Sequence, residues 1–146
     1  MAADGWRPFF DELRDAFEGF AADVGGDLHT VNHSRGCKAW FGTDTREHYE
    51  AQLVRVDGEV VLEIGFHAEN RDRDANHRLV ARLGEAVDWR DQLGPDAVAG
   101  DFLGNKVWQR ISEVWKEPEP DPEVAIEAAA RLADYVRTLE PARRGS

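Results

Sequence analysis

The sequence predicts an α+β fold in which an antiparallel β-meander of four to five strands has helices packed on one face. Three observations support this: an amphipathic helical pattern at each end of the chain, a run of short strand patterns after the first helix, and hairpin turn signals between those strands. Strands that follow one another before further helices are typical of an antiparallel sheet. The expected order is α-β-β-β-β-α-β-α, within one domain of residues 1–146.

The first helix is expected over about residues 8–24. Pro8 suits the first turn of a helix, where its missing amide hydrogen is not needed, and Gly25-Gly26 ends the pattern. The apolar residues recur at spacings of three and four, so they fall on one face of the helix. These residues are Phe9, Phe10, Leu13, Phe17, Phe20 and Val24.

Four strands are expected to follow: Leu28–His33, Lys38–Gly42, Glu47–Val56 and Glu59–Ala68. The first two strands form a hairpin around Arg35-Gly36, and Thr43-Asp44-Thr45 is a turn. Asp57-Gly58 lies between two alternating runs, which is a strong signal for a two-residue hairpin turn.

A second helix is expected to begin with Asp72 or Asp74 as its cap, and Gly94-Pro95 is expected to end this helix or a short extension of it through Trp89 and Leu93. Residues 95–106 are expected to form a loop, because they contain two glycines and an asparagine. The segment Val107–Lys116 fits either a helix face or a strand. A strand is favoured, since the segment is short and rich in β-branched and aromatic residues.

Residues 117–122 are acidic and rich in proline, so they are expected to form an extended connector. Asp121 offers a capping side chain and Pro122 fits the first helical position, so a helix is expected to begin there. This helix is expected to end at Pro141, followed by a flexible tail over 142–146.

Charge limits the partners that the chain can bind. It has 29 acidic and 18 basic residues, for a net charge of −11. Overall charge of this sign repels nucleic acid and anionic membrane surfaces, so we expect neither as a partner through overall charge. Cys37 is the only cysteine, and the N-terminus has no apolar signal segment. Both observations favour a soluble, cytoplasmic protein.

No sequence motif of the common hydrolases, NTPases or zinc proteases is present. Cys37 lies near His33, and such a pair can generate a thiolate nucleophile. A lone cysteine is more often a small buried apolar residue, and this is the interpretation we favour. The residues therefore leave open whether the protein is an enzyme.

The strongest candidate site follows from the register of the hairpin around Asp57-Gly58. The register that puts the apolar residues on one face places His48 directly across from His67 on the other, with Glu50 two residues along. Two imidazoles and a carboxylate can bind Zn²⁺ or Fe²⁺, which predicts a divalent transition metal as cofactor. Two alternatives stay open, a proton relay tuned by Glu50 or Glu63 and an ordinary solvated sheet face.

Residues for binding a ligand or partner are expected on the strands: Trp40, Gln52, Glu63 and Trp108. The five tryptophans could line an apolar pocket or a partner groove, or they could pack in the core. We expect a non-catalytic protein-binding or adaptor module of a chaperone-like kind. The alternative is a metal-binding or small-molecule-binding enzyme that uses the polar sheet face around His48, Glu50 and His67.

Several short segments carry a resemblance to a known family. They are Glu63–His67 at the end of a hairpin, Asn76 and Leu83 in the next helix, and Trp108–Ile111 before the acidic connector. Over residues 35–141 the chain resembles an uncharacterised bacterial α+β domain family of unknown function. The resemblance implies the order of the elements and no established activity.

Overall fold

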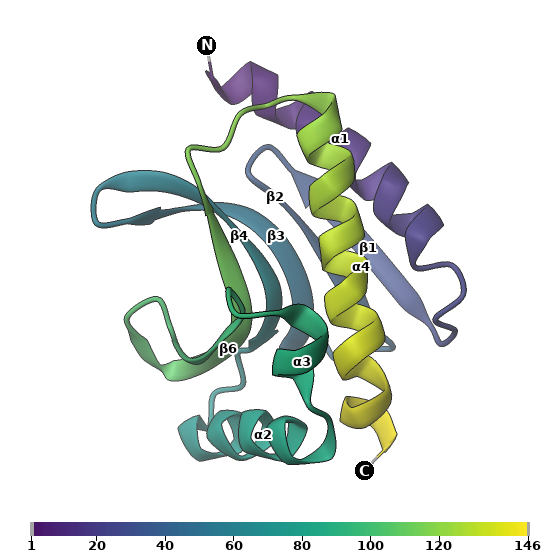
Figure 1. Cartoon of the computed structure of the whole chain (residues 1–146), viewed down its shortest axis with the longest axis vertical. Coiled ribbons are helices and arrows are strands. Elements are labelled where there is room, and N and C mark those ends of the chain that lie inside the picture. Colours follow the sequence, from purple (N-terminus) through teal and green to yellow (C-terminus); the bar gives the residue numbers. More distant parts are fainter. Residues whose placement is uncertain (1, 146) are drawn as a thin grey trace.

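The computed structural model describes residues 2–145, with side chains from Gly5 onward. These residues contain four helices and six strands (Figure 1). They are α1 (Ala2–Phe20), β1 (Leu28–His33), β2 (Gly36–Phe41), β3 (Glu47–Val56), β4 (Glu59–Ala68), α2 (Arg73–Ala86), α3 (Trp89–Leu93), β5 (Val98–Phe102), β6 (Asn105–Lys116) and α4 (Pro122–Gly145).

The six strands form one antiparallel sheet in the order β1-β2-β3-β4-β6-β5. The first four strands are a meander, as predicted, and the ambiguous segment before the acidic connector is strand β6. The first turn lies one residue earlier than expected, because Gly36 already pairs with His33. The expected loop over 95–106 is wrong, since β5 pairs with β6 through a turn at Leu103-Gly104.

The central hairpin has the predicted register. Asp57 and Gly58 both have positive φ, 52° and 82°, as a type I′ turn requires. Leu53 is paired with Leu62, and the pairing continues outward in steps of two. One face of β3 and β4 is therefore apolar and fully or almost fully buried; it carries Tyr49, Ala51, Leu53, Leu62, Ile64 and Phe66.

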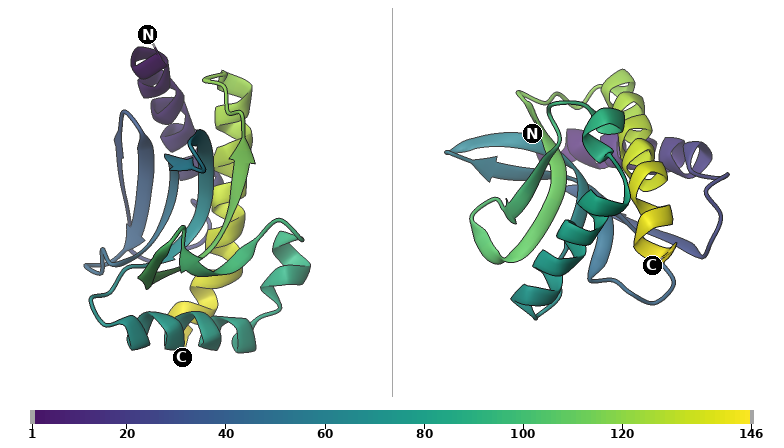
Figure 2. Two further views of the ribbon diagram at one scale, coloured as in Figure 1. Left: turned by 90° about the vertical axis from the view of Figure 1, so that its left-hand side faces the viewer. Right: turned by 60° about the horizontal axis from the view of Figure 1, so that its bottom comes forward.

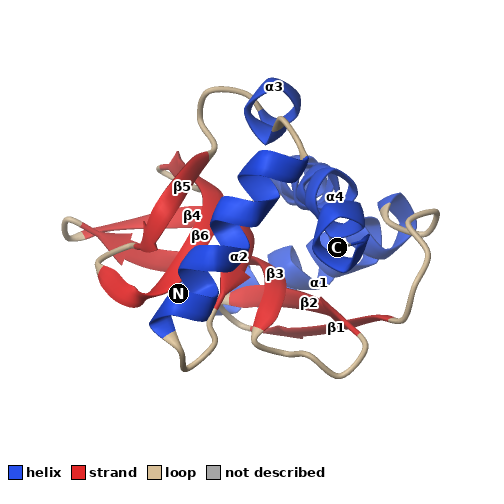
Figure 3. Cartoon of the chain, turned by 90° about the horizontal axis from the view of Figure 1, so that it is seen from below, coloured by secondary structure: helices blue, strands red, loops and turns tan. Residues whose placement is uncertain are grey.

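Helices α1 and α4 pack against each other on this side of the sheet, α1 against β1 and β2 and α4 against β3 and β4, so the predicted α+β class with helices on one face is confirmed (Figure 3). Each helix contributes buried residues at helical spacing, among them Leu13, Phe17, Leu132 and Leu139. The hydroxyl of Tyr49 donates a 2.9 Å hydrogen bond to the buried carboxylate of Glu140 on α4. Within residues 2–145, no helix has the length and apolar character needed to cross a membrane.

Both terminal helices differ from the predicted bounds. Helix α1 begins at Ala2, so Pro8 lies inside it, and it ends at Phe20. Helix α4 begins at Pro122 as predicted, with the Asp121 carboxylate accepting from the amide of Glu123 at 2.8 Å.

The expected end of α4 at Pro141 is wrong, because the helix continues to Gly145. Arg82 on α2 donates to the carbonyls of Ala142 and Arg143 at 3.0 and 3.2 Å, which satisfies acceptors that a helix end leaves free. Figure 2 shows α2 and the end of α4 at the same end of the molecule. Of the expected flexible tail, Ser146 lies outside the described residues.

Gly65 on β4 is the position where the sheet is most tightly constrained. Its φ is 156°, and a Cβ atom there would lie 2.4 Å from the Ile111 carbonyl oxygen and 2.5 Å from Ser112 Cα. Both atoms belong to the backbone of β6, which pairs Ser112 with Gly65. The close approach of β6 to β4 therefore requires a residue without a side chain.

We expect Gly65→Ala to lower the free energy of unfolding by at least about 2 kcal/mol, because the new methyl group collides with backbone that cannot move away. Urea denaturation of both proteins measures the difference. Gly19→Ala is the matched control, since a Cβ atom at Gly19 on α1 meets nothing within 4 Å. The control should be neutral or stabilise by less than about 1 kcal/mol, and equal stabilities of the two variants would contradict this account.

Candidate metal centre

The face of the sheet opposite α4 is polar, and its centre is buried. We call it the polar face; it carries Lys38, His48, Glu50, Gln52, Glu63, Gly65, His67, Arg110 and Ser112. The side chains of His48 and His67 are only 1% and 0% exposed. Glu63 is fully buried as well. The alternative of an ordinary solvated sheet face is therefore wrong for this part of the chain.

The two histidines lie directly across from each other in the register predicted from the sequence. Their rings meet edge to face, with centroids 5.2 Å apart and planes at 83°. His67 Nδ1 lies 3.3 Å from His48 Nε2. The Phe102 ring, from β5, meets His67 edge to face, with ring centroids 4.5 Å apart. The β5–β6 hairpin thus supplies part of the cover over the pair.

Two carboxylates converge on the same point. Glu50 Oε1 lies 3.2 Å from His48 Nε2 and 3.4 Å from His67 Nδ1. Glu69 Oε2 lies 3.5 and 3.6 Å from the same two nitrogen atoms. The four atoms all lie within 4.8 Å of one another. Four ligands at 2.0–2.1 Å from a tetrahedral metal ion are separated by about 3.3–3.4 Å, close to the nitrogen–nitrogen and nitrogen–oxygen distances found here.

The outer ring nitrogens of both histidines have acceptors of their own. His48 Nδ1 donates to the carbonyl of Thr45 at 2.9 Å, and His67 Nε2 donates to Glu63 at 2.7 Å. In the neutral form of each ring, which a bound metal ion requires, the one hydrogen lies on the outer nitrogen and a lone pair on the nitrogen that faces inward. A histidine that binds a metal ion generally donates from its other nitrogen to a carboxylate or carbonyl in this way.

The buried carboxylates and His67 shift one another's pKa values in the direction that favours the charged forms. Burial lowers the pKa of His67, but the charges and hydrogen bonds of Glu63 and Glu50 outweigh burial and raise this pKa to about 10. Burial raises the pKa of Glu50, yet hydrogen bonds from His48 and His67 bring it down to about 2. The pKa of Glu63 is also lowered, mainly by His67 against the effect of burial. Glu50 and Glu63 are therefore ionised, and the cationic group that they face in the absence of a metal ion is protonated His67.

The four residues predicted to bind a ligand or partner have different surroundings. Gln52 donates to Glu63 at 3.1 Å, so these two residues support the histidine pair from the side. Trp40 is half-buried and stacks on His29, with ring centroids 5.6 Å apart. Trp108 is half-buried and meets Phe102 edge to face. Their ring contacts thus lie with other aromatic groups rather than with the histidine pair.

Glu69 is the member of the cluster that the sequence analysis missed. It follows the last residue of β4, where the strand was expected to end. Its amide nevertheless donates to the carbonyl of Arg46, which extends the pairing with β3 by one step. Glu63, Gly65, His67 and Glu69 therefore share one face, and continuing the alternation past Ala68 would have identified Glu69.

Cys37 and His33 do not form a catalytic pair. The Cys37 side chain lies in the core, whereas His33 is exposed and interacts with the amide of Arg35. Burial raises the pKa of the Cys37 thiol to about 12, and the charge of Arg14 offsets this only in part. The residue is a buried apolar group, as favoured from the sequence.

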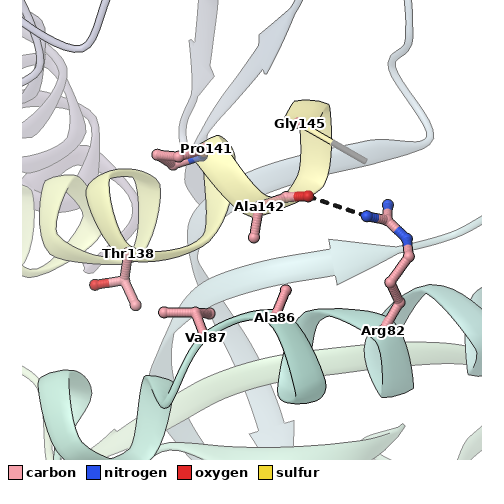
Figure 4. Close-up of a pocket in the computed structure, with 7 residues that line it drawn as sticks. All are labelled: Arg82, Ala86, Val87, Thr138, Pro141, Ala142 and Gly145. Carbon is pink, nitrogen blue, oxygen red and sulfur yellow. Dashed lines mark hydrogen bonds between the residues drawn. The ribbon is translucent and has the colours of Figure 1, made fainter.

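A cavity of about 470 Å³ lies away from the polar face, between the end of α2 and the end of α4 (Figure 4). Small and apolar groups such as Ala86, Val87 and Pro141 line much of it, and its one charged side chain, Arg82, is engaged by the Ala142 and Arg143 carbonyls. It contains no histidine or carboxylate. Among the described residues, the histidines and carboxylates that could hold a metal ion lie instead around His48 and His67.

Comparisons with protein-family models, with characterised proteins and with solved structures find no match for this chain. The resemblance to an uncharacterised bacterial family therefore stays a prediction, and the site is interpreted from its own geometry.

The burial of Cys37 predicts that it resists alkylation. With a pKa of about 12, only about one thiol in ten thousand is ionised at pH 8, against about a quarter at the usual pKa of 8.5. Iodoacetamide at pH 8 should leave the folded protein unmodified by mass spectrometry and should modify it fully in urea. Modification of the folded protein at the rate of an exposed thiol would contradict this prediction.

Proposed function

We propose that the protein binds one divalent transition metal ion, Zn²⁺ or Fe²⁺, between His48, Glu50, His67 and Glu69. The observation that carries this proposal is the convergence of two imidazole nitrogens and two carboxylate oxygens within 4.8 Å of one another. Both rings have acceptors for their outer nitrogens, so in their neutral form they present lone pairs to the ion. A divalent ion would balance the charges of the two carboxylates.

The ligand types favour these two metals. Imidazole suits Zn²⁺ and Fe²⁺, whereas a site made only of oxygen ligands would suit Mg²⁺ or Ca²⁺. Spacings of 3.2–3.6 Å between the nitrogens and oxygens match a small four-coordinate ion. Glu63 and the Thr45 carbonyl would hold the two rings in the orientation and tautomer that the metal requires.

The proton relay is supported less well. A relay needs a group whose pKa lies near the working pH, so that it both gains and loses a proton. The carboxylates around His67 raise its pKa to about 10, so a metal-free His67 keeps its proton at neutral pH. The adaptor function expected from the sequence would use an open sheet face or exposed aromatic side chains. Burial of the polar centre counts against the open face and favours metal binding there. The expected absence of nucleic-acid and membrane partners stays a prediction.

Metal analysis tests the proposal directly. Protein made without a histidine tag in medium supplemented with Zn²⁺ or Fe²⁺ should contain about one metal ion per chain. His48→Ala and His67→Ala should abolish this stoichiometric binding. Glu63→Gln removes only the outer partner of His67 and should weaken binding by about 10- to 100-fold. Inductively coupled plasma mass spectrometry and competition with a chelator measure the two effects.

Two controls separate metal loss from misfolding. His29→Ala and His33→Ala remove exposed histidines on β1 and should keep full metal content. Glu69→Gln changes the most exposed ligand, so it should fold normally and still bind more weakly. A chelator should lower the unfolding temperature of the wild type, because the metal binds only the folded chain, and should leave His67→Ala unchanged. A wild-type protein that stays metal-free after supplementation and is insensitive to chelator would disprove the site.

A further inference from the structure

Arg110 on β6 lies beside the proposed metal site with part of its guanidinium unused. It is paired with His67 across the sheet, so both side chains belong to the polar face. Arg110 Nη1 donates to the Ser112 hydroxyl at 2.8 Å and to the Ser112 carbonyl at 3.2 Å. Arg110 Nε is buried and has no hydrogen-bond partner among the described residues.

The unused part of Arg110 is the edge that recognises oxyanions. The Nε–H and the neighbouring Nη2 group point in parallel and can hold two oxygen atoms of one carboxylate or phosphate. A buried N–H group that has lost water without gaining an acceptor destabilises the protein. A bound oxyanion would satisfy this edge.

The carboxylates of the protein do not fill this role. Glu50 and Glu69 are directed at the inner nitrogens of His48 and His67, and Glu63 binds the outer nitrogen of His67. No ion pair joins Arg110 to a carboxylate within the described part of the chain. Ser112, which holds the guanidinium, pairs with Gly65, and Gly65 pairs with Glu50, so the guanidinium lies on the same face of the sheet as the proposed ligands.

The charge on the polar face makes this binding dependent on the metal. Glu50, Glu63 and Glu69 carry three negative charges, and Lys38 and Arg110 carry two positive charges. Lys38 is half-buried opposite Glu50 and, within the described residues, forms no ion pair. Protonated His67 adds a third positive charge while no metal is bound, so these groups are neutral together. A divalent cation that takes the place of this proton gives them one net positive charge, so the attraction for an anion is stronger after the metal has bound.

We propose that the metal-loaded protein binds a small oxyanion of the carboxylate or phosphate class on the free edge of Arg110, next to the metal. This inference rests on the proposed metal site. Glu69 is the most exposed of the four proposed ligands, at 19%, and has the longest contacts to the histidines, so it would be the ligand that an oxygen of the anion replaces.

The test uses the full chain loaded with Co²⁺, whose visible absorption reports a change of ligands around the metal. Titration with sodium acetate, and separately with sodium phosphate, should change the spectrum in a saturable way. The two titrations distinguish a carboxylate from a phosphate as the preferred class. Arg110→Gln should weaken the response by about 10- to 100-fold, as expected for one charged hydrogen-bonded pair, while Co²⁺ still binds at one ion per chain.

Two further variants complete the design. Arg110→Lys keeps the charge but loses the two-pronged edge, so it should weaken the response less than Arg110→Gln. Arg55→Gln makes the same change in charge at an exposed position near the hairpin tip and should behave as wild type. If Co²⁺ binds but neither anion gives a saturable change, or Arg110→Gln equals wild type, the anion site is disproved and the metal site stands. If Co²⁺ itself does not bind, the metal site fails and the anion inference fails with it.

Discussion

The register of the β3–β4 hairpin is the constraint on which both the fold and the candidate site depend. The turn at Asp57-Gly58 fixes this register, because both residues have the positive φ that a tight hairpin turn requires. From that turn, the two-residue period of a strand sends the apolar side chains toward α4 and sends His48 and His67 to the polar face. A slip of one residue would exchange the two faces, so the residues that build the core also position the candidate metal ligands.

Features set by local sequence could be predicted closely, and features set by distant contacts could not. The hairpin and the start of α4 depend on neighbouring residues such as Asp57-Gly58 and Asp121-Pro122, and both lie where the sequence places them. Strand β5 is a five-residue edge strand that contains Gly100 and is held by its pairing with β6. The last turn of α4 continues past Pro141 where Arg82, from a separate helix, binds its carbonyls. No short-range pattern contains that information.

Within the candidate site, too, some features follow from local sequence and others depend on distant contacts. The histidine pair follows from the hairpin register, so sequence reasoning brings His48, Glu50 and His67 together. Burial of the pair depends partly on Phe102 in β5, a strand that the sequence did not predict. The free edge of Arg110 depends on how its guanidinium meets Ser112, which a strand pattern does not specify. Residue types and spacing thus identify candidate ligands, and tertiary contacts decide their surroundings.

The two faces of the sheet differ in what they contribute to stability. The apolar face and the two helices above it form a continuous core, which supplies the hydrophobic stabilisation of the domain. Burying two histidines and two further carboxylates on the polar face costs free energy of desolvation, and well-packed apolar residues often replace buried charges without loss of stability. The fold alone therefore gives no reason for His48, Glu50, Glu63 and His67 to be buried together. The proposed cation would give one, since it would offset the negative charge of the carboxylates and bind the lone pairs of the two imidazoles.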